Sequence, residues 1–359
     1  MSHIQAFSMN AKILKIKGSN PDLSKIRIAA NAIRKGNLVV FPTETVYGIG
    51  ADATNAKACK KIFKAKNRPS DNPLIVHVSD IKMAEEIAHI PKEYSKIIEK
   101  IWPAPITFIM KAKKILPSVV TSGLNTVAVR MPADKIAISL ISESGTPIAA
   151  PSANISKRPS STSGKHAITY FKKSVDVILD AGPSKFGIES TVLDLLTFTL
   201  LRPGAFTLDE ITKAFGKKPK LLEESEEISK IKKPISPGMK YKHYSPETRV
   251  LLFEGDAKRL PGILIKYKKR FVFIGSKETA SMLSGISKKN IILGRKNDRK
   301  SIARNLFKSL INLDSLGAEF CITESFSERD YGLAIMNRLR KASGHKYFRT
   351  AEELKNYIN

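Results

Sequence analysis

Hydroxyl and acidic side chains follow the first strongly apolar run of the chain. That run, LVVF at 38–41, leads directly into PTETVYG, which places Thr43, Glu44 and Thr45 where a strand should end. In open α/β sheets ligands bind at the carboxyl ends of strands, so these side chains could contact a polar substrate. The same residues also suit an ordinary turn whose threonine hydroxyls cap backbone groups.

Two cations stand close together just beyond a predicted helix. Residues 55–66 carry an apolar stripe at helical spacing, and Pro69 in KAKNRPSDNP helps to end the helix. Lys66 and Arg68 at its exit are therefore close enough to grip one polyanion. The alternative is that both charges simply complement the negative end of the helix dipole.

Two apolar runs each carry polar residues on one face of a predicted strand. In LIVHV, alternation places His77 with Ile75 on the face opposite the other three residues. In TVAVRM, the same period places Thr126, Ala128 and Arg130 on one face, which suggests the floor of a site for a small anion. A structural histidine and a salt-bridged arginine are the alternatives.

A further apolar strand runs into a loop rich in hydroxyls and cations. Ser152 and Asn154 stand at its start in AAPSAN, and ISKRPSSTSG continues it. Loops of this composition offer hydroxyl and backbone donors to phosphates. A flexible, solvent-exposed loop is the alternative.

Two glycine-containing segments come near phosphate-binding patterns without matching them. GIGADA (48–53) has the G-x-G-x-x-A spacing, but PTETVY separates it from the preceding strand, where a dinucleotide fingerprint needs an immediate turn. GPSKFG (182–187) has Walker A spacing, but Ile188 and Glu189 replace the Lys-Ser/Thr that binds phosphate and magnesium. The sequence therefore favours neither a Rossmann dinucleotide site nor a P-loop.

Nucleophilic and metal chemistry have no signature in the sequence. It contains no recognisable Ser-His-Asp, Cys-His or G-x-S-x-G arrangement, and its six histidines are far apart. Cys59 and Cys321 cannot build a disulfide framework, and no Cys/His group has metal-ligand spacing. We therefore expect no metal centre made of side chains.

The elements that must position these residues indicate two α/β domains. Residues 1–215 alternate short apolar runs with helical stretches, which predicts a mixed sheet. Residues 216–246 are charged and contain prolines, as expected of a linker, and 247–359 resume the alternation as a smaller domain with a parallel sheet. The predicted strands are 38–41, 74–78, 126–131, 175–179, 191–195, 199–201, 250–253, 270–274, 290–293 and 319–323, and the predicted helices are 23–34, 55–66, 83–100, 301–313 and 332–342.

Charge is the extreme feature of the composition. The 359 residues are 42% hydrophobic, a globular value, yet 61 Lys and Arg against 33 Asp and Glu give a net charge of +28 spread over the whole chain. Such a field attracts nucleic acids and nucleotides, although a solvated lysine-rich surface would look the same. No apolar run reaches about 18 residues and the start lacks a secretory signal, so we expect no membrane partner and a cytoplasmic protein.

The segments above, taken together, resemble the YrdC-like family, specifically the two-domain threonylcarbamoyl-AMP synthases. The resemblance implies an N-terminal YrdC-like domain with a twisted mixed sheet flanked by helices, and a smaller C-terminal Rossmann-like α/β domain. It also implies a linker that reaches over the active site. The matching segments are FPTETVYGIG (41–50), KNRPSDNPLIVHV (66–78), VAVRMP (127–132), PIAAPSANIS (147–156), DAGPSKFGIESTVLDL (180–195), LRPGAF (201–206) and SPGMKYKHYSP (236–246).

The resemblance implies a nucleotidyltransferase. L-threonine, bicarbonate and ATP would give L-threonylcarbamoyl-AMP and pyrophosphate, with Mg²⁺ on the ATP phosphates and no protein nucleophile. The product would supply the threonylcarbamoyl group for N6-threonylcarbamoyladenosine in tRNA, through a partner transferase machinery and with direct tRNA contact left open. The alternative is a non-catalytic RNA-binding or regulatory member of the same fold.

The resemblance also implies residue roles. Lys66 and Arg68 would be catalytic through the ATP phosphates. Lys157 is a departure, because the family often has glycine after SANIS, and this bears on the conformation of the loop that holds Ser160. Threonine would be bound by Thr43, Thr45, His77, Arg130 and Thr191, and ATP by Lys66, Arg68, Asn72, Thr126, Ser152, Asn154, Ser160, Arg202 and, as a lid, Tyr241.

Overall fold

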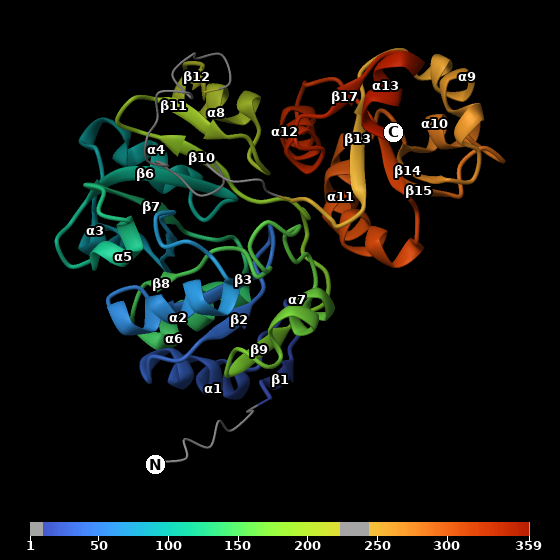
Figure 1. The fold of residues 1–359 in the computed structure, drawn as a ribbon. Helices are drawn as coiled ribbons and strands as arrows, with labels where there is room; N and C mark the ends of the chain where they lie inside the picture. Colours follow the sequence, from blue (N-terminus) through green and yellow to red (C-terminus); the bar gives the residue numbers. More distant parts are fainter. Residues whose placement is uncertain (1–9, 223–243, 359) are drawn as a thin grey trace.

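Two β-sheets organise the chain, each in its own unit (Figure 1). The structure, a computed structural model, describes residues 10–222 and 244–358. No helix within these ranges is both long and apolar enough to cross a membrane.

The first unit contains a mixed sheet of twelve strands. Its order is β1-β9-β2-β3-β8-β4-β7-β6-β10-β11-β12, with β5 paired to β6 beside this path. Parallel pairs such as β4 with β7 adjoin antiparallel pairs such as β2 with β3, so the predicted mixed sheet is confirmed. The strands are β1 Lys12–Lys15, β2 Val39–Phe41, β3 Gly48–Asp52, β4 Ile75–His77, β5 Ala88–His89, β6 Ile106–Ala112, β7 Thr126–Arg130, β8 Ile148–Ala149, β9 Val177–Asp180, β10 Thr191–Asp194, β11 Thr199–Arg202 and β12 Lys220–Leu221.

Alternation along the strands places helices on both faces of this sheet. In β2, Val39 and Phe41 pack in one core with helices α1 and α6, whereas Val40 packs in the other core with α2 and α7. The helices are α1 Leu23–Arg34, α2 Ala56–Lys66, α3 Ile81–Ile87, α4 Ser95–Ile101, α5 Ser118–Thr121, α6 Lys135–Ser144, α7 Gly164–Phe171 and α8 Leu208–Phe215.

The helix predicted over residues 83–100 is wrong as a single element. Helix α3 ends at Ile87, and β5 and a 3-10 turn at Lys92–Tyr94 precede α4. Pro91 explains the break, because proline lacks the N–H that a continuous helix needs and its ring clashes with the preceding turn.

The two near-miss glycine motifs serve packing. Gly48 and Gly50 lie within β3, antiparallel to β2, and a Cβ on Gly50 would come within 2.7 Å of both Phe41 and Ile148. Gly187 has a φ of +68° and lies against the backbone of Arg304 in the second unit. Glycine is therefore required at Gly50 and Gly187 by the close approach of protein atoms.

The second unit has a five-stranded sheet in the order β15-β14-β16-β13-β17. Every pair in it is parallel, which confirms the sequence prediction, and helices pack on both faces. The strands are β13 Arg249–Phe253, β14 Phe271–Ser276, β15 Lys289–Gly294, β16 Phe320–Glu324 and β17 Tyr347–Phe348, and the helices are α9 Leu260–Leu264, α10 Lys277–Met282, α11 Arg299–Leu313, α12 Gly332–Ala342 and α13 Ala351–Ile358.

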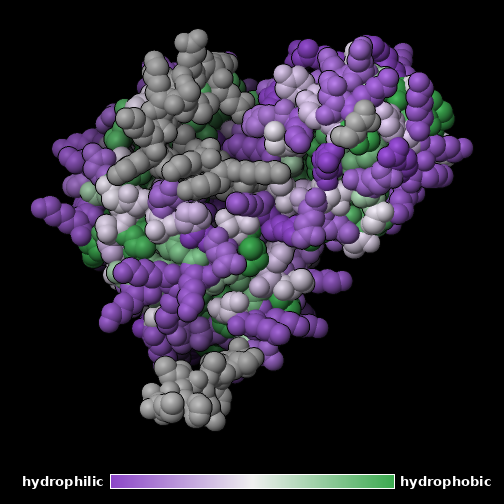
Figure 2. Space-filling view, viewed as in Figure 1, coloured by the Kyte–Doolittle hydropathy of each residue, from purple (hydrophilic) through white to green (hydrophobic). Residues whose placement is uncertain are grey.

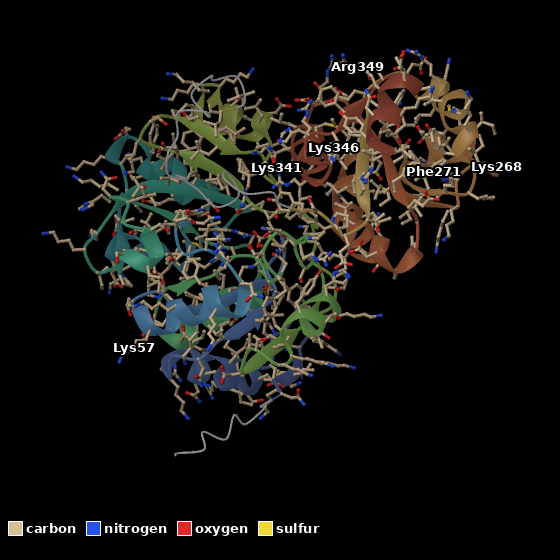
Figure 3. All side chains as sticks on the ribbon, viewed as in Figure 1. Lys57, Lys268, Phe271, Lys341, Lys346 and Arg349 are labelled. Carbon is tan, nitrogen blue, oxygen red and sulfur yellow. The ribbon has the colours of Figure 1, made fainter. Side chains whose placement is uncertain are left out.

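One face of the second unit packs against the first unit. Helices α11 and α12 share a core with Val46, Ile188 and Ala205, three residues of the first unit (Figure 1). On the outside, the displayed face of both units is mostly hydrophilic (Figure 2). Lys57 of the first unit and Lys268 of the second are both exposed and lie far from each other (Figure 3), which agrees with a positive charge distributed over the whole chain.

Candidate active site

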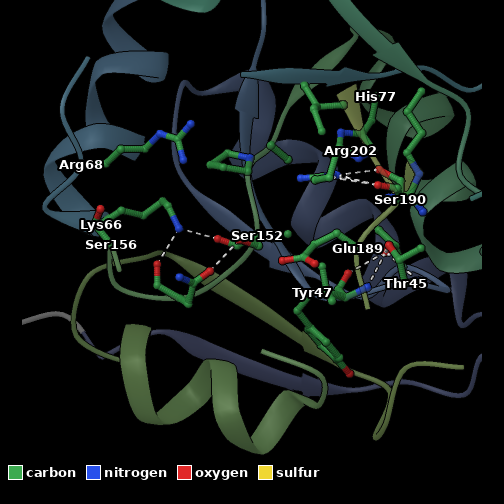
Figure 4. A pocket seen from close by; sticks show the side chains of 18 of the residues that line it. Thr45, Tyr47, Lys66, Arg68, His77, Ser152, Ser156, Glu189, Ser190 and Arg202 are labelled. Carbon is green, nitrogen blue, oxygen red and sulfur yellow. Dashed lines mark hydrogen bonds between the residues drawn. The ribbon is translucent and has the colours of Figure 1, made fainter. Parts of the chain in front are cut away.

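One cavity of the first unit gathers side chains from segments far apart in the chain (Figure 4). Residues at or just after the ends of several strands form much of its wall. His77, Arg130 and Arg202 are the last residues of β4, β7 and β11, as expected for a site at strand ends. The lining residues are Thr43, Thr45, Val46, Tyr47, Gly48, Lys66, Arg68, Ile75, His77, Arg130, Ala150, Pro151, Ser152, Asn154, Ser156, Lys157, Glu189, Ser190, Arg202 and Tyr244.

Most of the residues expected in the site lie together in this wall. Thr43, Thr45, Lys66, Arg68, His77, Arg130, Ser152, Asn154 and Arg202 all line the cavity.

The other expected residues lie elsewhere. Asn72 and Ser160 are buried but do not line the cavity, Thr126 opens β7 at the end away from Arg130, and Thr191 exchanges hydrogen bonds with the backbone of Phe206. Their roles stay predictions, and Tyr241 lies outside the described residues.

Lys66 ties the end of α2 to the loop after β8. Its side chain is 1% exposed, and Nζ donates to the backbone oxygens of Ser152 and Asn154, both at 2.5 Å. Burial, with the charge of Arg68 added, lowers the pKa of Lys66 well below its ordinary value. An ammonium has three N–H donors, so the one not used by these carbonyls is available to a phosphate, whose charge would favour the ammonium form.

Ser152 and Asn154 are themselves fixed by the loop. Ser152 Oγ donates to Asn154 Oδ1 at 2.6 Å, and Asn154 Nδ2 donates to the carbonyls of Ile155 and Arg158. Ser160, Ser161 and Thr162 farther along the segment are buried, so this part of the loop lies against the protein rather than in solvent. Arg68 lies opposite and donates to the carbonyl of Asn72 at 3.2 Å.

A buried ion pair forms the floor beside His77. Arg130 Nη2 lies 2.6 Å from Glu44 Oε1, and both side chains are 4% exposed. Within the described residues, Arg130 Nε and His77 Nδ1 are buried without a hydrogen-bond partner, as is expected of groups that await a ligand. Burial first, and then the charge of Arg130, lower the pKa of His77 to about 3, so its ring is neutral near pH 7.

The segment after β2 is a turn and also part of the wall. Thr43 Oγ1 donates to the carbonyl of Val46 at 2.6 Å and accepts from the N–H groups of Thr45 and Val46. The Thr43 and Thr45 hydroxyls lie 2.8 Å apart. Both alternatives from the sequence therefore hold, because the capping turn is what presents these hydroxyls.

Sequence reasoning missed Glu189 and Ser190 as wall residues. Glu189 Oε1 accepts from Ser160 Oγ at 2.6 Å, and Arg202 donates to both the carbonyl and the hydroxyl of Ser190. Burial opposes ionisation of Glu189, but the charges of Arg338 and Arg202 outweigh it and lower its pKa to about 2. GIESTV does place a carboxylate just before the strand predicted over 191–195, and that was the available signal.

Tyr244 and Lys157 close the cavity from the side of the second unit. Tyr244, 4% exposed, lies where the described chain resumes, and the N–H of the next residue, Ser245, donates to the carbonyl of Lys157 at 3.0 Å. Lys157 has a φ of 73°, a left-handed conformation that glycine adopts without strain. The departure from the family pattern is therefore accommodated with the backbone in the conformation that a glycine would favour.

The charge of the wall suits a polyanion. Five basic side chains, Lys66, Arg68, Arg130, Lys157 and Arg202, line the cavity, and Glu189 is the one carboxylate among its described lining residues. Over the same described residues, no three His, Cys, Asp or Glu side chains gather as a metal site. The arrangement can neutralise phosphates and pair a carboxylate.

Comparisons with known proteins match nearly the whole chain. A family model described as "Telomere recombination" matches residues 31–204, and one described as "Threonylcarbamoyl-AMP synthase, C-terminal domain" matches residues 206–344. A threonylcarbamoyl-AMP synthase of Pyrococcus abyssi is 43% identical over 90% of this chain and 95% of its own length. One of Bacillus subtilis is 41% identical over 90% and 94%.

A solved structure agrees with both units. The crystal structure of P. abyssi Sua5 complexed with L-threonine superposes with a TM-score of 0.86 at 41% identity. The match covers 94% of this chain and 99% of that one.

Proposed function

Since the chain belongs to the family of two-domain threonylcarbamoyl-AMP synthases, which are nucleotidyl-transferring enzymes, we propose that it makes L-threonylcarbamoyl-AMP and pyrophosphate from L-threonine, bicarbonate and ATP. The observation that carries the proposal is the cavity wall. Basic side chains suited to a triphosphate adjoin a buried arginine and hydroxyls suited to an amino acid.

The threonine end of the site would be the floor. Arg130 offers a guanidinium whose Nε has no hydrogen-bond partner among the described residues, and it would pair with the substrate carboxylate. The hydroxyl of Thr45 would contact the substrate, with Thr43 holding the turn. His77 would act as a neutral hydrogen-bonding group, because its depressed pKa keeps the ring uncharged. L-threonine bound to the P. abyssi relative supports this substrate.

The phosphate end would be the cationic side of the wall. The threonine amine and bicarbonate would form a carbamate with loss of water, and a carbamate oxygen would attack the α-phosphorus as pyrophosphate leaves. Lys66, Arg68 and Arg202 would neutralise the charge that develops on the phosphates, the dominant contribution in such transfers. The fixed loop of Ser152 and Asn154 would orient the nucleotide.

Magnesium would enter on the ATP phosphates. Glu189, the carboxylate of the wall, is occupied by Ser160 and Arg338, so it has little capacity left to bind a cation. Phosphate oxygens and water would therefore supply most of the metal's ligands, as is usual for Mg²⁺.

The product is an activated acyl donor and needs an acceptor. We propose that a transferase machinery passes the threonylcarbamoyl group to adenosine in tRNA, and that the enzyme works where tRNA and ATP meet, in the cytoplasm. The net charge of +28 would favour direct contact with tRNA, which should then weaken steeply with salt.

An adenylate assay tests the function. The protein is incubated with MgATP, bicarbonate and L-threonine, and pyrophosphate release and new adenylates are followed by chromatography. We expect product only when all three substrates and Mg²⁺ are present. ATP binding without turnover would refute the proposal and favour the non-catalytic RNA-binding or regulatory alternative.

A further inference from the structure

A buried arginine of the second unit contacts a residue in the wall of the first unit's cavity. Arg338 lies in α12 and is 0% exposed. Its Nε and Nη2 donate to Glu189 Oε2 at 3.1 and 2.9 Å, and its Nη1 donates to the carbonyls of Pro203 and Ala334. The guanidinium therefore joins α12 to two segments of the first unit, the one before β10 and the one after β11.

Glu189 passes this contact on to the cavity wall. While Oε2 accepts from Arg338, Oε1 accepts from Ser160 Oγ at 2.6 Å, in the loop expected to bind the nucleotide. The carbonyl of Glu189 also accepts from Ala205 N–H at 3.1 Å, close to Arg202 in sequence. A buried carboxylate is tolerated only when its charge is compensated, so removing the arginine would leave Arg202 as the remaining cation beside Glu189 and would favour its protonated form.

Tyr244 lies beside the same guanidinium. Its ring centre is 5.9 Å from the guanidinium carbon of Arg338 and 5.0 Å from the ring of Phe307 in α11. The next residue, Ser245, donates from Oγ to the carbonyl of Ala342, the last residue of α12. One helix of the second unit thus holds both Glu189 and the aromatic ring that closes the cavity.

We propose that Arg338 is a positioning residue for adenylate formation, through which the second unit keeps Glu189 ionised and directed at Ser160 in the nucleotide loop. The second unit thereby completes an active site whose substrate-contacting residues lie mostly in the first. This inference rests on the proposed function, because its effect is measured on the adenylate reaction.

A double-mutant cycle tests the link between the two residues. Arg338→Met, Glu189→Gln and the double variant are assayed for kcat/KM for ATP, with threonine saturating. We expect each single variant to lose about tenfold or more, and the double variant to lose about as much as Arg338→Met alone, because the arginine acts through the carboxylate. Losses that multiply in the double variant would overturn the proposal.

A pH profile separates positioning from general destabilisation. Against the effect of burial, Arg338, Arg202 and Ser160 lower the pKa of Glu189, and Tyr244 also faces it. In Arg338→Met the larger of the two cationic contributions is gone while Arg202 remains, so that pKa rises. The variant should then lose kcat/KM for ATP as the pH falls from 8 to 5, beyond any loss of the wild type, and the double variant should not show this extra loss. Profiles of identical shape in Arg338→Met and the wild type would overturn the proposal.

Matched controls exclude charge and folding effects. Arg270→Met removes a cation of the second unit whose ion pair is with Glu319 of the same unit, and it should leave kcat/KM unchanged. If Arg338→Met does not fold, Arg338→Lys is assayed in its place. Lysine keeps the positive charge but loses one of the two hydrogen bonds that Arg338 donates to Glu189 Oε2. A folded Arg338→Lys variant with the full activity of the wild type would count against the proposal. A wild-type protein without adenylate-forming activity would instead refute the proposed function itself.

Discussion

Replacing His77 with glutamine should remove a pH-dependent loss of stability from the first unit. His77 ends β4 and is 4% exposed, and burial together with the charge of Arg130 lowers its pKa from 6.5 to about 3. Below pH 6.5 the unfolded chain binds a proton at this histidine that the folded chain does not bind. The free energy of unfolding that the neutral ring contributes is therefore fully present above pH 6.5 and is lost progressively as the pH falls towards 3.

The magnitude follows from the two pKa values. Each pH unit below 6.5 costs about 1.4 kcal/mol until the folded protein also binds the proton. At pH 5 the wild type should therefore have lost about 2 kcal/mol through His77, relative to pH 7.5. Glutamine does not titrate, so His77→Gln should lose about 2 kcal/mol less than the wild type over the same interval.

Urea unfolding measures this difference. The fluorescence of Trp102, the single tryptophan of the chain, reports on the first unit, where its ring packs 5.2 Å from that of Phe108. His89→Gln is the matched control, because His89 is exposed in the same unit, and it should behave as the wild type does. An equal loss of stability in His77→Gln and the wild type between pH 7.5 and 5 would refute the reasoning.

Three further substitutions test the wall of the cavity. Lys66→Met should lower kcat/KM for ATP by about 10²-fold, because it removes a cation from the phosphates and leaves two carbonyls without their donor. Lys64 is exposed on the same helix, and Lys64→Met should not lower kcat/KM for ATP. Lys157→Gly should raise stability in urea unfolding by up to about 1 kcal/mol, since it relieves a left-handed lysine; a loss of stability would contradict this. Arg130→Lys keeps the charge beside Glu44 but loses the guanidinium fork, so the KM for L-threonine should rise about tenfold, and a rise confined to the KM for ATP would count against the assignment.

Local sequence patterns predicted the frame of the site well. Period-two alternation placed Ala128 and Arg130 on one face of β7 and Val127 and Val129 on the other, and the cores confirm this. Such predictions succeed because the direction of a side chain in a strand depends only on its position along the strand. The single helix predicted over 83–100 is wrong because the prediction relied on apolar spacing and overlooked the break at Pro91.

Contacts between distant segments were beyond these patterns. Nothing near Lys66 in sequence indicates that its ammonium would be held by the carbonyls of Ser152 and Asn154. Thr191 and Thr126 were expected at the site, yet neither lies in the cavity wall, because the pairing and stagger of the strands decide which residues reach it. Those pairings are set by the packing of the whole sheet.

The sequence by itself determined the alternation of strands and helices, the α/β class and the polar residues at several strand ends, since each of these follows from local periodicity and composition. It did not predict β1, β3 and β6 or the helices α6 to α8. Only the tertiary structure decided that Arg338, 149 residues beyond Glu189, pairs with this carboxylate of the cavity wall. An ion pair of this kind exists because α12 packs on the first unit and buries both charges together. Local periodicity contains no record of which buried charges will meet, because that depends on how separate elements dock.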